Sequence, residues 1–224
     1  MNKKLKIVAL LPIKLNSERV PGKNFKILGL KPVYKWILDK LISINLIDNI
    51  IINTDAIEKF NNINSSKVIV RKRKKKICGD DVSMNLVIED DLMSNDGDIF
   101  FMTHATNPFL KKKTIINSIK AFKKKLNLVD SFFSVTKYQS RFYDEYCKPI
   151  NHDPKKLIKT QDLKIWYEEN SSFYIFTKTS FKSNKSRIGI RPFPYITEKL
   201  ESLDIDTIDD WKMAEAIVKS NIKI

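Results

Sequence analysis

Two aspartates close to the carboxyl end of the chain, Asp204 and Asp206, stand one residue apart in the segment LDIDTIDDW. In an extended strand, side chains two residues apart point to the same side, so both carboxylates can reach one ligand. Carboxylate oxygens suit Mg²⁺, which proteins often bind together with nucleotide phosphates. We therefore predict a Mg²⁺ site at these two residues. The acids Asp209 and Asp210 have the ordinary explanation that negative charge is favoured where a helix begins.

A second set of chemically suited side chains lies in the loop of residues 12–24. Its cations Lys14, Arg19 and Lys23 could neutralise phosphate oxygens, and its backbone N–H groups and hydroxyls could wrap around them. The loop follows a predicted buried strand, and open α/β sheets bind ligands at the carboxyl ends of their strands. This position favours a triphosphate site, with a plain polar surface loop as the alternative.

Two other polar features have simpler explanations when taken alone. His104, one of only two histidines, follows an apolar segment. A single histidine at such a place more often positions a ligand than moves a proton, so we predict a positioning role. The run RKRKKK at residues 71–76 is the densest cluster of charge, and a solvated loop would explain it.

The elements that must position these side chains follow from the hydrophobic pattern. The apolar run at residues 5–11 is typical of a central strand that is covered on both faces. Residues 31–45 have apolar side chains at helical spacing and predict an amphipathic helix. Strands and helices then alternate, which favours an α/β sheet with right-handed crossovers. We expect further strands at 49–53, 68–70, 98–102, 131–136 and 172–177, and helices ending at Phe60, at 83–93, at 113–125 and after Asp206.

The alternation stops after Asp130. Residues 139–168 are irregular and polar, which predicts an insertion or arm in place of another strand–helix unit. Arms of this kind commonly make dimer contacts.

Composition limits the class of partner. The 224 residues include 41 basic and 26 acidic side chains, and the formal charge is +15. Such a charge is typical of nucleic-acid-binding proteins. Only six of the 41 basic residues are arginines, however, which indicates a general lysine bias and not a recognition surface. We therefore predict no nucleic-acid partner, and we expect the positive field to concentrate a small anionic substrate.

No membrane or secretion signal is predicted. The first apolar run has seven residues, and no stretch approaches the roughly 20 apolar residues of a membrane span. Cys78 and Cys147 lie far apart in the sequence and form neither a disulfide framework nor a zinc motif. We therefore expect a cytoplasmic protein.

The loop at residues 12–24 resembles that of the acylneuraminate cytidylyltransferase (CMP-acylneuraminate synthetase) family, in which PARGGSKxxPxKN follows the first strand. The shared residues are Pro12, Ser17, Pro21, Lys23 and Asn24. The chain departs from the motif in having Lys14 for the usual Arg, Leu15 and Asn16 for the glycine pair, and Glu18 for a Lys. The resemblance implies catalytic roles for Lys14, Arg19 and Lys23 on the departing pyrophosphate, and nucleotide binding by Asn16, Ser17 and Asn24.

Two segments in the middle of the chain extend the resemblance. RKKKICGDDVS at residues 73–83 is similar to the family's RPxxLxGDxxS, which implies that Arg73 and Ser83 contact the nucleotide. HATNPF at residues 104–109 is similar to the family's QPTSP turn beside the acidic sugar. The implied sugar ligands are His104, Thr106 and Asn107.

Two later segments complete the resemblance to the family. TQDL and EENSSFYIF resemble a Gln-containing segment and the ENGxxY strand that form the far wall of the family's sugar pocket, with Ser171 at the usual Gly position. This implies sugar binding by Gln161, Glu169, Asn170 and Tyr174. LDIDTIDDW resembles the family's DIDxxxDW metal motif and supports Asp204 and Asp206 as metal ligands with a catalytic role.

The resemblance implies one domain over residues 1–224 with a Rossmann-like nucleotidyltransferase α/β fold. A mostly parallel central sheet would carry helices on both faces, with a small dimerisation insertion at about residues 139–170. The implied activity joins CTP to a nonulosonic acid, an acidic nine-carbon sugar, giving CMP-sugar and pyrophosphate, with Mg²⁺ as cofactor and a homodimer as the assembly. Two alternatives stay open. One is a 3-deoxy-manno-octulosonate cytidylyltransferase, to which RVPGK at residues 19–23 is also similar, and the other is a non-catalytic nucleotide- or nucleic-acid-binding homologue.

Overall fold

A seven-stranded sheet with the order β5-β4-β1-β6-β8-β7-β9 organises the computed structural model, which describes residues 4–220. Strand β8 pairs antiparallel with β6 and β7, and every other pairing in this sheet is parallel. The mostly parallel sheet that the alternating pattern predicts is therefore confirmed. The strands are β1 Ile7–Leu10, β4 Asn49–Thr54, β5 Val68–Lys72, β6 Ile99–Thr103, β7 Ser131–Tyr138, β8 Trp166–Thr177 and β9 Pro192–Ile196.

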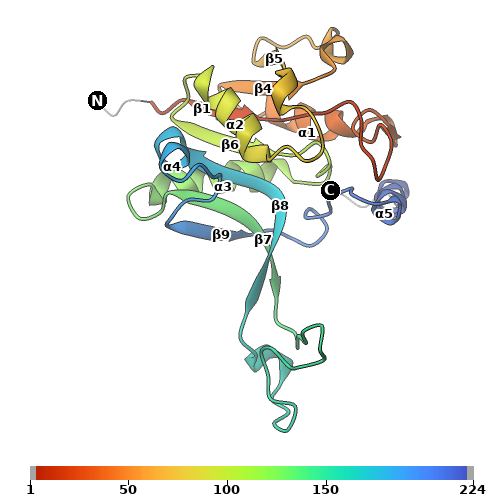
Figure 1. Cartoon of the computed structure of the whole chain (residues 1–224), viewed down its shortest axis with the longest axis vertical. Helices are drawn as coiled ribbons and strands as arrows, with labels where there is room; N and C mark the ends of the chain where they lie inside the picture. The colour runs from red at the N-terminus through yellow and green to blue at the C-terminus, as the bar shows by residue number, and fades with distance from the viewer. Residues whose placement is uncertain (1–3, 221–224) are drawn as a thin grey trace.

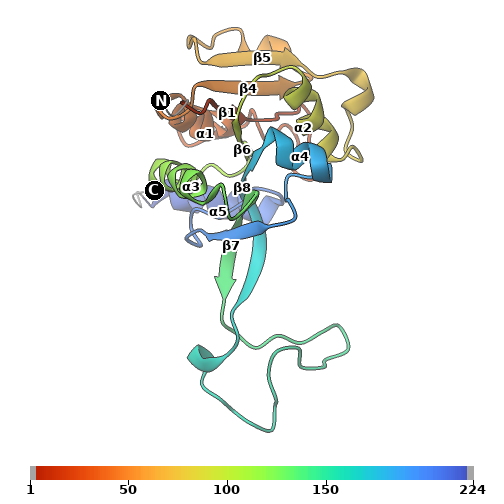
Figure 2. The ribbon, with the colours of Figure 1, turned by 90° about the vertical axis from the view of Figure 1, so that its left-hand side faces the viewer.

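Helices cover both faces of the sheet, as predicted. Alternate residues of β1 point to opposite faces, so Ile7 and Ala9 join one buried cluster while Val8 and Leu10 join another. The first cluster includes side chains of α1 and α3, and the second includes side chains of α2 and α4. Figure 2 shows these two pairs of helices on either side of the sheet. The helices are α1 Val33–Ile42, α2 Met84–Met93, α3 Lys112–Lys125, α4 Lys178–Asn184 and α5 Ile208–Lys219, with short 3₁₀ turns at Ile57–Phe60, Lys75–Ile77 and Thr160–Asp162.

Some boundaries differ from those that the sequence predicts. The helix expected from residue 31 begins at Val33, because Lys31–Pro32 pairs with Ile27–Leu28 in a small antiparallel hairpin, β3 with β2. Strand β8 begins at Trp166 and not at residue 172, because the polar residues that precede its apolar core pair with the outer half of β7.

Besides the hairpin strands β2 and β3, the elements α4 and β9 were missed by the sequence analysis. Helix α4 has seven residues, too few to give a clear helical period. Strand β9 contains Pro192 and Pro194 and pairs only with β7 at the edge of the sheet. Proline cannot donate a ladder hydrogen bond and is tolerated at such an edge, so the composition of this segment hid its conformation.

The segment of residues 139–165 leaves the body of the molecule between β7 and β8. Figure 1 shows it as an arm that extends well beyond the sheet, carried by the outer ends of these two strands. We call these residues the arm. Among the described residues, no helix has the length and apolar character needed to cross a membrane.

Candidate active site

A pocket of about 320 Å³ opens beside the carboxyl ends of β1 and β6, and we call it the central pocket. This is the edge of the sheet at which the sequence predicts a ligand site. Three backbone segments that are distant in the sequence meet here: the loop after β1, the turn after β6 and the segment before α5. The lining residues are Pro12, Lys14, Arg19, Lys23, Asn24, Arg73, Met84, His104, Ala105, Thr106, Ser171, Arg187, Asp204 and Asp206.

A third buried cluster holds these three segments together. It joins Val20 of the loop after β1, Phe109 of the turn after β6, Ile205 of the segment before α5, and Trp211 of α5 itself. Full burial of one large apolar side chain contributes roughly 1.5–3 kcal/mol, so these anchors hold the polar residues on either side of them in fixed places.

The loop after β1 carries its cations into two adjoining pockets. Asn24 donates to the carbonyl of Lys14 at 2.8 Å, which ties the two ends of the loop together. A smaller pocket of about 170 Å³, which we call the basic pocket, lies next to the central pocket and shares Lys14, Arg19 and Lys23 with it. Its other lining residues are Ser17, Glu18 and Asp80. Ser17, another residue of the basic pocket, has a buried hydroxyl without a hydrogen-bond partner. An anion would satisfy that hydroxyl.

Asp204 and Asp206 line the central pocket from an extended segment that is not a strand of the sheet. The backbone N–H of Ile205 donates to the carbonyl of Thr106 at 2.9 Å, and the Ile205 side chain is fully buried. With Ile205 directed into the core, its two neighbours both reach the pocket. The prediction of a strand here is wrong. The two carboxylates nevertheless lie on the same side of the segment, as the prediction of a shared ligand site requires.

The two carboxylates have different electrostatic surroundings. Burial raises the pKa of Asp204, and one of its carboxylate oxygens has no hydrogen-bond partner. Burial also acts against ionisation of Asp206, but Lys23 and Arg19 outweigh it and hold the pKa of this carboxyl below its usual value. The Nζ of Lys23 lies 2.7 Å from Asp206, and the guanidinium of Arg19 lies 3.1 Å from it.

These residues fit a divalent cation of the magnesium type. Asp204 offers a buried oxygen with no partner, and a nearby cation would favour its charged form. No cluster of three or more His, Cys, Asp or Glu side chains suited to a metal occurs among residues 4–220. A cation held by these two carboxylates would therefore take its remaining ligands from water or phosphate, which is usual for Mg²⁺.

Helix α5 fixes the end of the carboxylate segment. Thr207 and Asp210 form a reciprocal capping box at its start, and Asp210 also accepts from the backbone N–H of Asp206 at 3.1 Å. Asp210 therefore caps the helix, as its ordinary explanation predicts, and in addition holds the backbone of Asp206.

Arg73 reaches the central pocket from a buried network. Its side chain donates to the side-chain oxygen of Asn53 at 2.9 Å and to the Asn53 carbonyl at 2.8 Å. Asn53 in turn donates to Asp91 of α2 at 2.8 Å, and Asp91 accepts from Arg71. The basic run at residues 71–76 therefore contains two structural arginines and is not only a solvated loop.

Of the two other predicted nucleotide ligands, Ser83 forms the N-cap of α2, where its hydroxyl accepts from the backbone N–H of Asn85 at 3.3 Å. Ser83 and Asn16 are both exposed. Neither is among the residues that line the central pocket.

The turn after β6 places His104 and Thr106 in the central pocket. Burial, and then the charge of Arg187, lowers the pKa of His104 to about 3, so its imidazole is neutral near pH 7. Asn107 is fully buried and donates to the carbonyl of Leu203 at 3.4 Å. It therefore supports the carboxylate segment and does not reach the pocket as a ligand.

A second pocket, of about 440 Å³, lies between the central pocket and the base of the arm, and we call it the arm-side pocket. Asp204, Asp206 and Ser171 line both pockets. Glu169 and Asn170 line the arm-side pocket only. The carboxylate pair therefore stands at the boundary between two ligand-sized spaces.

The comparisons with known proteins agree with this arrangement. The sequence model of the Cytidylyltransferase family matches residues 8–222. The chain belongs to the Cytidylyltransferase family.

A curated relative in this family is the CMP-N,N'-diacetyllegionaminic acid synthase of Legionella pneumophila, which is 26% identical over 97% of this chain and 98% of its own length. The N-acylneuraminate cytidylyltransferase of Streptococcus agalactiae serotype V is 27% identical over 92% of this chain and 52% of its own length. The chain thus spans about half the length of that relative and nearly all of the first.

Solved cytidylyltransferase structures share the fold. A CMP-2-keto-3-deoxy-manno-octonic acid synthetase complexed with CTP superposes with a TM-score of 0.68 at 12% identity, over 97% of this chain and 100% of the other. The 4-diphosphocytidyl-2C-methyl-D-erythritol synthase of Anaerococcus prevotii gives 0.67 at 14% identity, over 96% and 97%. The predicted nucleotidyltransferase fold is confirmed.

Ser171 marks a departure from the family motif that the backbone explains. It stands where the resembling ENGxxY motif has Gly, and its φ is +56°, a left-handed conformation that glycine adopts without penalty. Its hydroxyl lies 3.0 Å from that of Tyr174. Tyr174 is fully buried, donates to Glu169 and lines neither the central pocket nor the arm-side pocket.

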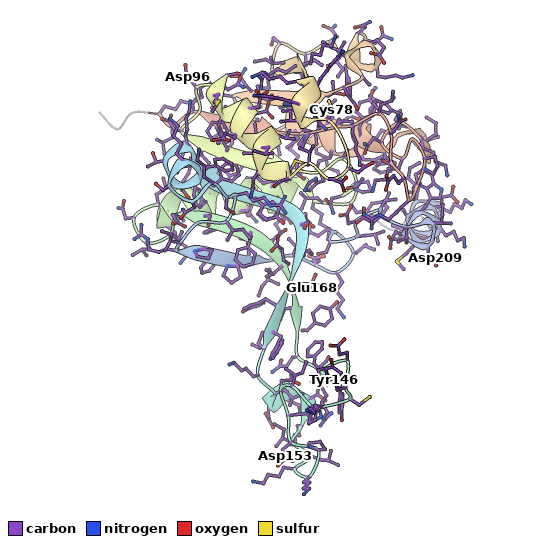
Figure 3. The ribbon with its side chains drawn as sticks, in the orientation of Figure 1. Cys78, Asp96, Tyr146, Asp153, Glu168 and Asp209 are labelled. Carbon is purple, nitrogen blue, oxygen red and sulfur yellow. The ribbon has the colours of Figure 1, made fainter. Side chains whose placement is uncertain are left out.

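The structure does not bring Gln161 to either pocket. This residue lies exposed in the arm, where its carbonyl accepts from Gln139 at 2.6 Å. Figure 3 shows the labelled arm residues Tyr146 and Asp153 far below the body, and Glu168 where β8 enters it. The arm carries Gln161 away from both pockets of its own chain, so sugar binding by Gln161 stays a prediction.

Arg187 lines the central pocket and was missed by the sequence analysis. It lies in the connection between α4 and β9, two elements that the sequence did not reveal. One signal was available: Arg19, Arg73 and Arg187 are three of only six arginines in a lysine-rich chain, and all three line this pocket.

Proposed function

We propose that this cytidylyltransferase joins CTP to a nonulosonic acid, an acidic nine-carbon sugar, and releases pyrophosphate. The observation that carries the proposal is the carboxylate pair at the boundary of two pockets, with Lys14, Arg19 and Lys23 on the side of the basic pocket. The names of the full-length Legionella relative and of the Streptococcus relative support an acidic sugar of this class.

In the proposed reaction, the anomeric hydroxyl oxygen of the sugar attacks the α-phosphorus of CTP. A new phosphorus–oxygen bond forms, the bond between the α-phosphorus and the oxygen that bridges to the β-phosphate breaks, and the hydroxyl proton passes to solvent water. Negative charge accumulates on the departing pyrophosphate, so cations near it stabilise the transition state. The basic pocket, with Lys14, Arg19, Lys23 and the unpaired hydroxyl of Ser17, is suited to that role.

We propose Asp204 and Asp206 as the residues that would hold Mg²⁺. When bound, the ion would neutralise phosphate charge and polarise the reacting groups. The ion pairs of Asp206 with Lys23 and Arg19 hold these two cations beside the proposed metal ligand, where they would also neutralise phosphate charge.

We assign the remaining residues by the pocket that they reach. Arg73 and Asn24 would bind the nucleotide in the central pocket. His104 and Thr106 would contact the sugar there, while Glu169 and Asn170 would do so from the arm-side pocket.

We also propose that the enzyme acts as a homodimer through the arm. Tyr146 and Leu157 of the arm are 73% and 81% exposed. Exposed apolar side chains on a projecting arm are suited to an interface, and a second copy of the chain would cover them.

Release of pyrophosphate from CTP and Mg²⁺ with a panel of acidic sugars tests the activity. We expect turnover with at least one nonulosonic acid and none without sugar. Turnover only with 3-deoxy-manno-octulosonate would favour that alternative, for which a 28% identical relative from Christiangramia forsetii matches 53% of this chain. Silence with every sugar, together with RNA binding that weakens steeply with salt, would overturn the enzyme proposal.

A further inference from the structure

Arg187 lines the central pocket but belongs to none of the motif segments identified in the sequence. Its guanidinium carbon lies 3.8 Å from the centre of the Tyr174 ring. This cation–π contact holds the guanidinium against the ring, while its N–H groups can still donate to a ligand. The side chain keeps 21% of its surface exposed, and it shares the pocket with His104 and Ser171.

The loop that carries Arg187 is held in place by hydrogen bonds to Asp130 and Ser131. The carboxylate of Asp130 accepts from the backbone N–H groups of Ile190 at 2.9 Å and of Arg191 at 3.1 Å. Gly189 packs so closely that a Cβ there would lie 2.2 Å from the same carboxylate. Its N–H also donates to Ser131 at 2.8 Å. Arg187 is therefore presented by a fixed backbone.

Arg187 is less closely paired with a carboxylate than three other cations of the central pocket, Lys14, Arg19 and Lys23. Lys23 and Arg19 lie close to Asp206, and Lys14 pairs with Asp80. The nearest carboxylate oxygen to Arg187 belongs to Glu169, at 3.6 Å. That oxygen already accepts from the Tyr174 hydroxyl.

The neighbours of Arg187 place this charge on the sugar side. The proposed phosphate cations come from the loop after β1, whereas Arg187 comes from the connection between α4 and β9 and contacts Tyr174 and Glu169 of β8. Glu169 lines the arm-side pocket. An anion held by Arg187 would thus lie between His104 and the arm-side pocket.

We propose that Arg187 is a specificity-determining residue that binds the carboxylate of the acidic sugar. This inference rests on the proposed function and names the side chain that would bind the acid group of the sugar. A planar guanidinium matches a carboxylate by two parallel hydrogen bonds. A neutral sugar would give Arg187 no carboxylate beyond the 3.6 Å contact with Glu169, and would bind less tightly for that reason.

The test uses the full chain with Arg187→Met, which removes the charge and keeps an unbranched apolar stem, and Arg187→Lys, which keeps the charge without the fork. The matched control is Arg191→Met, because Arg191 lies four residues away in the same loop, is exposed and does not line the central pocket. Circular dichroism and thermal unfolding check that each variant is folded.

We expect Arg187→Met to raise the KM for the acidic sugar by about 10-fold to 100-fold, as for loss of a charged hydrogen-bonded pair. The KM for CTP should change less than about 2-fold, and Arg187→Lys should lie between the parent and Arg187→Met. The sharper readout compares the sugar acid with its C1 amide as competitive inhibitors. Arg187→Met should weaken inhibition by the acid and leave inhibition by the amide unchanged.

Other results would overturn the assignment in recognisable ways. A parental KM for the sugar in Arg187→Met, with turnover intact, would remove Arg187 from sugar binding and leave the proposed function standing. A raised KM for CTP alone would assign the residue to the nucleotide. Equal loss of the acid and the amide would show a structural role. A parent that turns over no acidic sugar would overturn the proposed function and this inference together.

Discussion

At the scale of single residues, Asp206 connects the proposed metal to the cations of the loop after β1. It lies 2.7 Å from Lys23 and 3.1 Å from Arg19. We expect Asp206→Ala to reduce turnover by roughly 1,000-fold or more, because it removes a proposed metal ligand and an anchor for the cations. Lys23 would keep its hydrogen bond to the Ile205 carbonyl, so the fold should remain. Pyrophosphate release and circular dichroism measure the two effects.

The matched control for that prediction is Asp209→Ala. Asp209 lies in the same acidic segment, but its side chain is 89% exposed and pairs with Lys212 at 3.0 Å. It should keep the activity of the parent. Near-parental turnover in Asp206→Ala would refute the proposed roles of this carboxylate.

His104 gives a prediction about pH. Burial, with Arg187 as the second cause, lowers the pKa of its ring to about 3, whereas an unfolded histidine titrates near about 6.5. Below about pH 6.5 the unfolded chain therefore binds a proton that the folded chain does not, and the free energy of unfolding falls as the pH drops. His104→Gln removes this contribution.

The free energy of unfolding should fall between pH 7 and pH 5 in both proteins. We expect this fall to be smaller in His104→Gln than in the parent, by about 1–2 kcal/mol. Urea unfolding at both pH values, without added metal or nucleotide, measures the difference. The same pH dependence in both proteins would mean that His104 gains a proton in the folded chain as readily as in the unfolded chain.

At the scale of elements, the end of β4 positions the arginine proposed for the nucleotide. Asn53 is fully buried, accepts from Arg73 and donates to Asp91 of α2. We expect Asn53→Ala to raise the KM for CTP by about 10-fold, because Arg73 loses its orientation, and to lower the free energy of unfolding by about 1–3 kcal/mol, because buried polar groups lose partners. The KM for the sugar should stay near that of the parent.

Steady-state kinetics and urea unfolding test the role of Asn53, with Asn62→Ala as the control. Asn62 lies in the exposed turn after the 3₁₀ helix Ile57–Phe60. A destabilised Asn53→Ala variant with unchanged KM for CTP would leave Asn53 a purely structural residue.

The same elements show what the sequence can and cannot predict. The apolar runs of β1, β4 and β6 fill the centre of the sheet, so their pattern alone predicted them and the edge where the loop of residues 12–24 lies. The conformation near Arg187 could not be predicted in this way. It depends on hydrogen bonds to Asp130 and Ser131, about 60 residues earlier, and a short polar segment carries no periodic signal of such contacts.

Resemblance to a family motif has a limit of another kind. It gave Gln161 a role that requires a particular fold of the arm, and a motif does not specify how an insertion is placed. For Ser171 it noted the departure from Gly, and the left-handed φ of +56° explains why Gly is usual there. Several motif residues line one pocket in the structure, while the positions of side chains on long connections could not be predicted from motifs.

At the scale of the whole molecule, the positive charge and the arm have separate consequences. The formal charge of +15 is spread over a chain in which lysines far outnumber arginines. Long-range attraction of this kind speeds the arrival of anionic ligands, and salt weakens it. The arm, by contrast, offers apolar contact area, whose effect on association is largely insensitive to moderate salt.

The exposed apolar side chains of the arm lead to a prediction about how the protein associates. We expect the parent to sediment as a dimer at micromolar concentration, and the double variant Tyr146→Asp with Leu157→Asp to shift towards monomer, because burying the new charges in an interface would be unfavourable. The control is Leu30→Asp, since Leu30 is 101% exposed in the turn between β2 and β3 on the body. It should sediment like the parent. A monomeric parent, or an arm variant that remains dimeric with an unchanged dissociation constant, would contradict assembly through the arm.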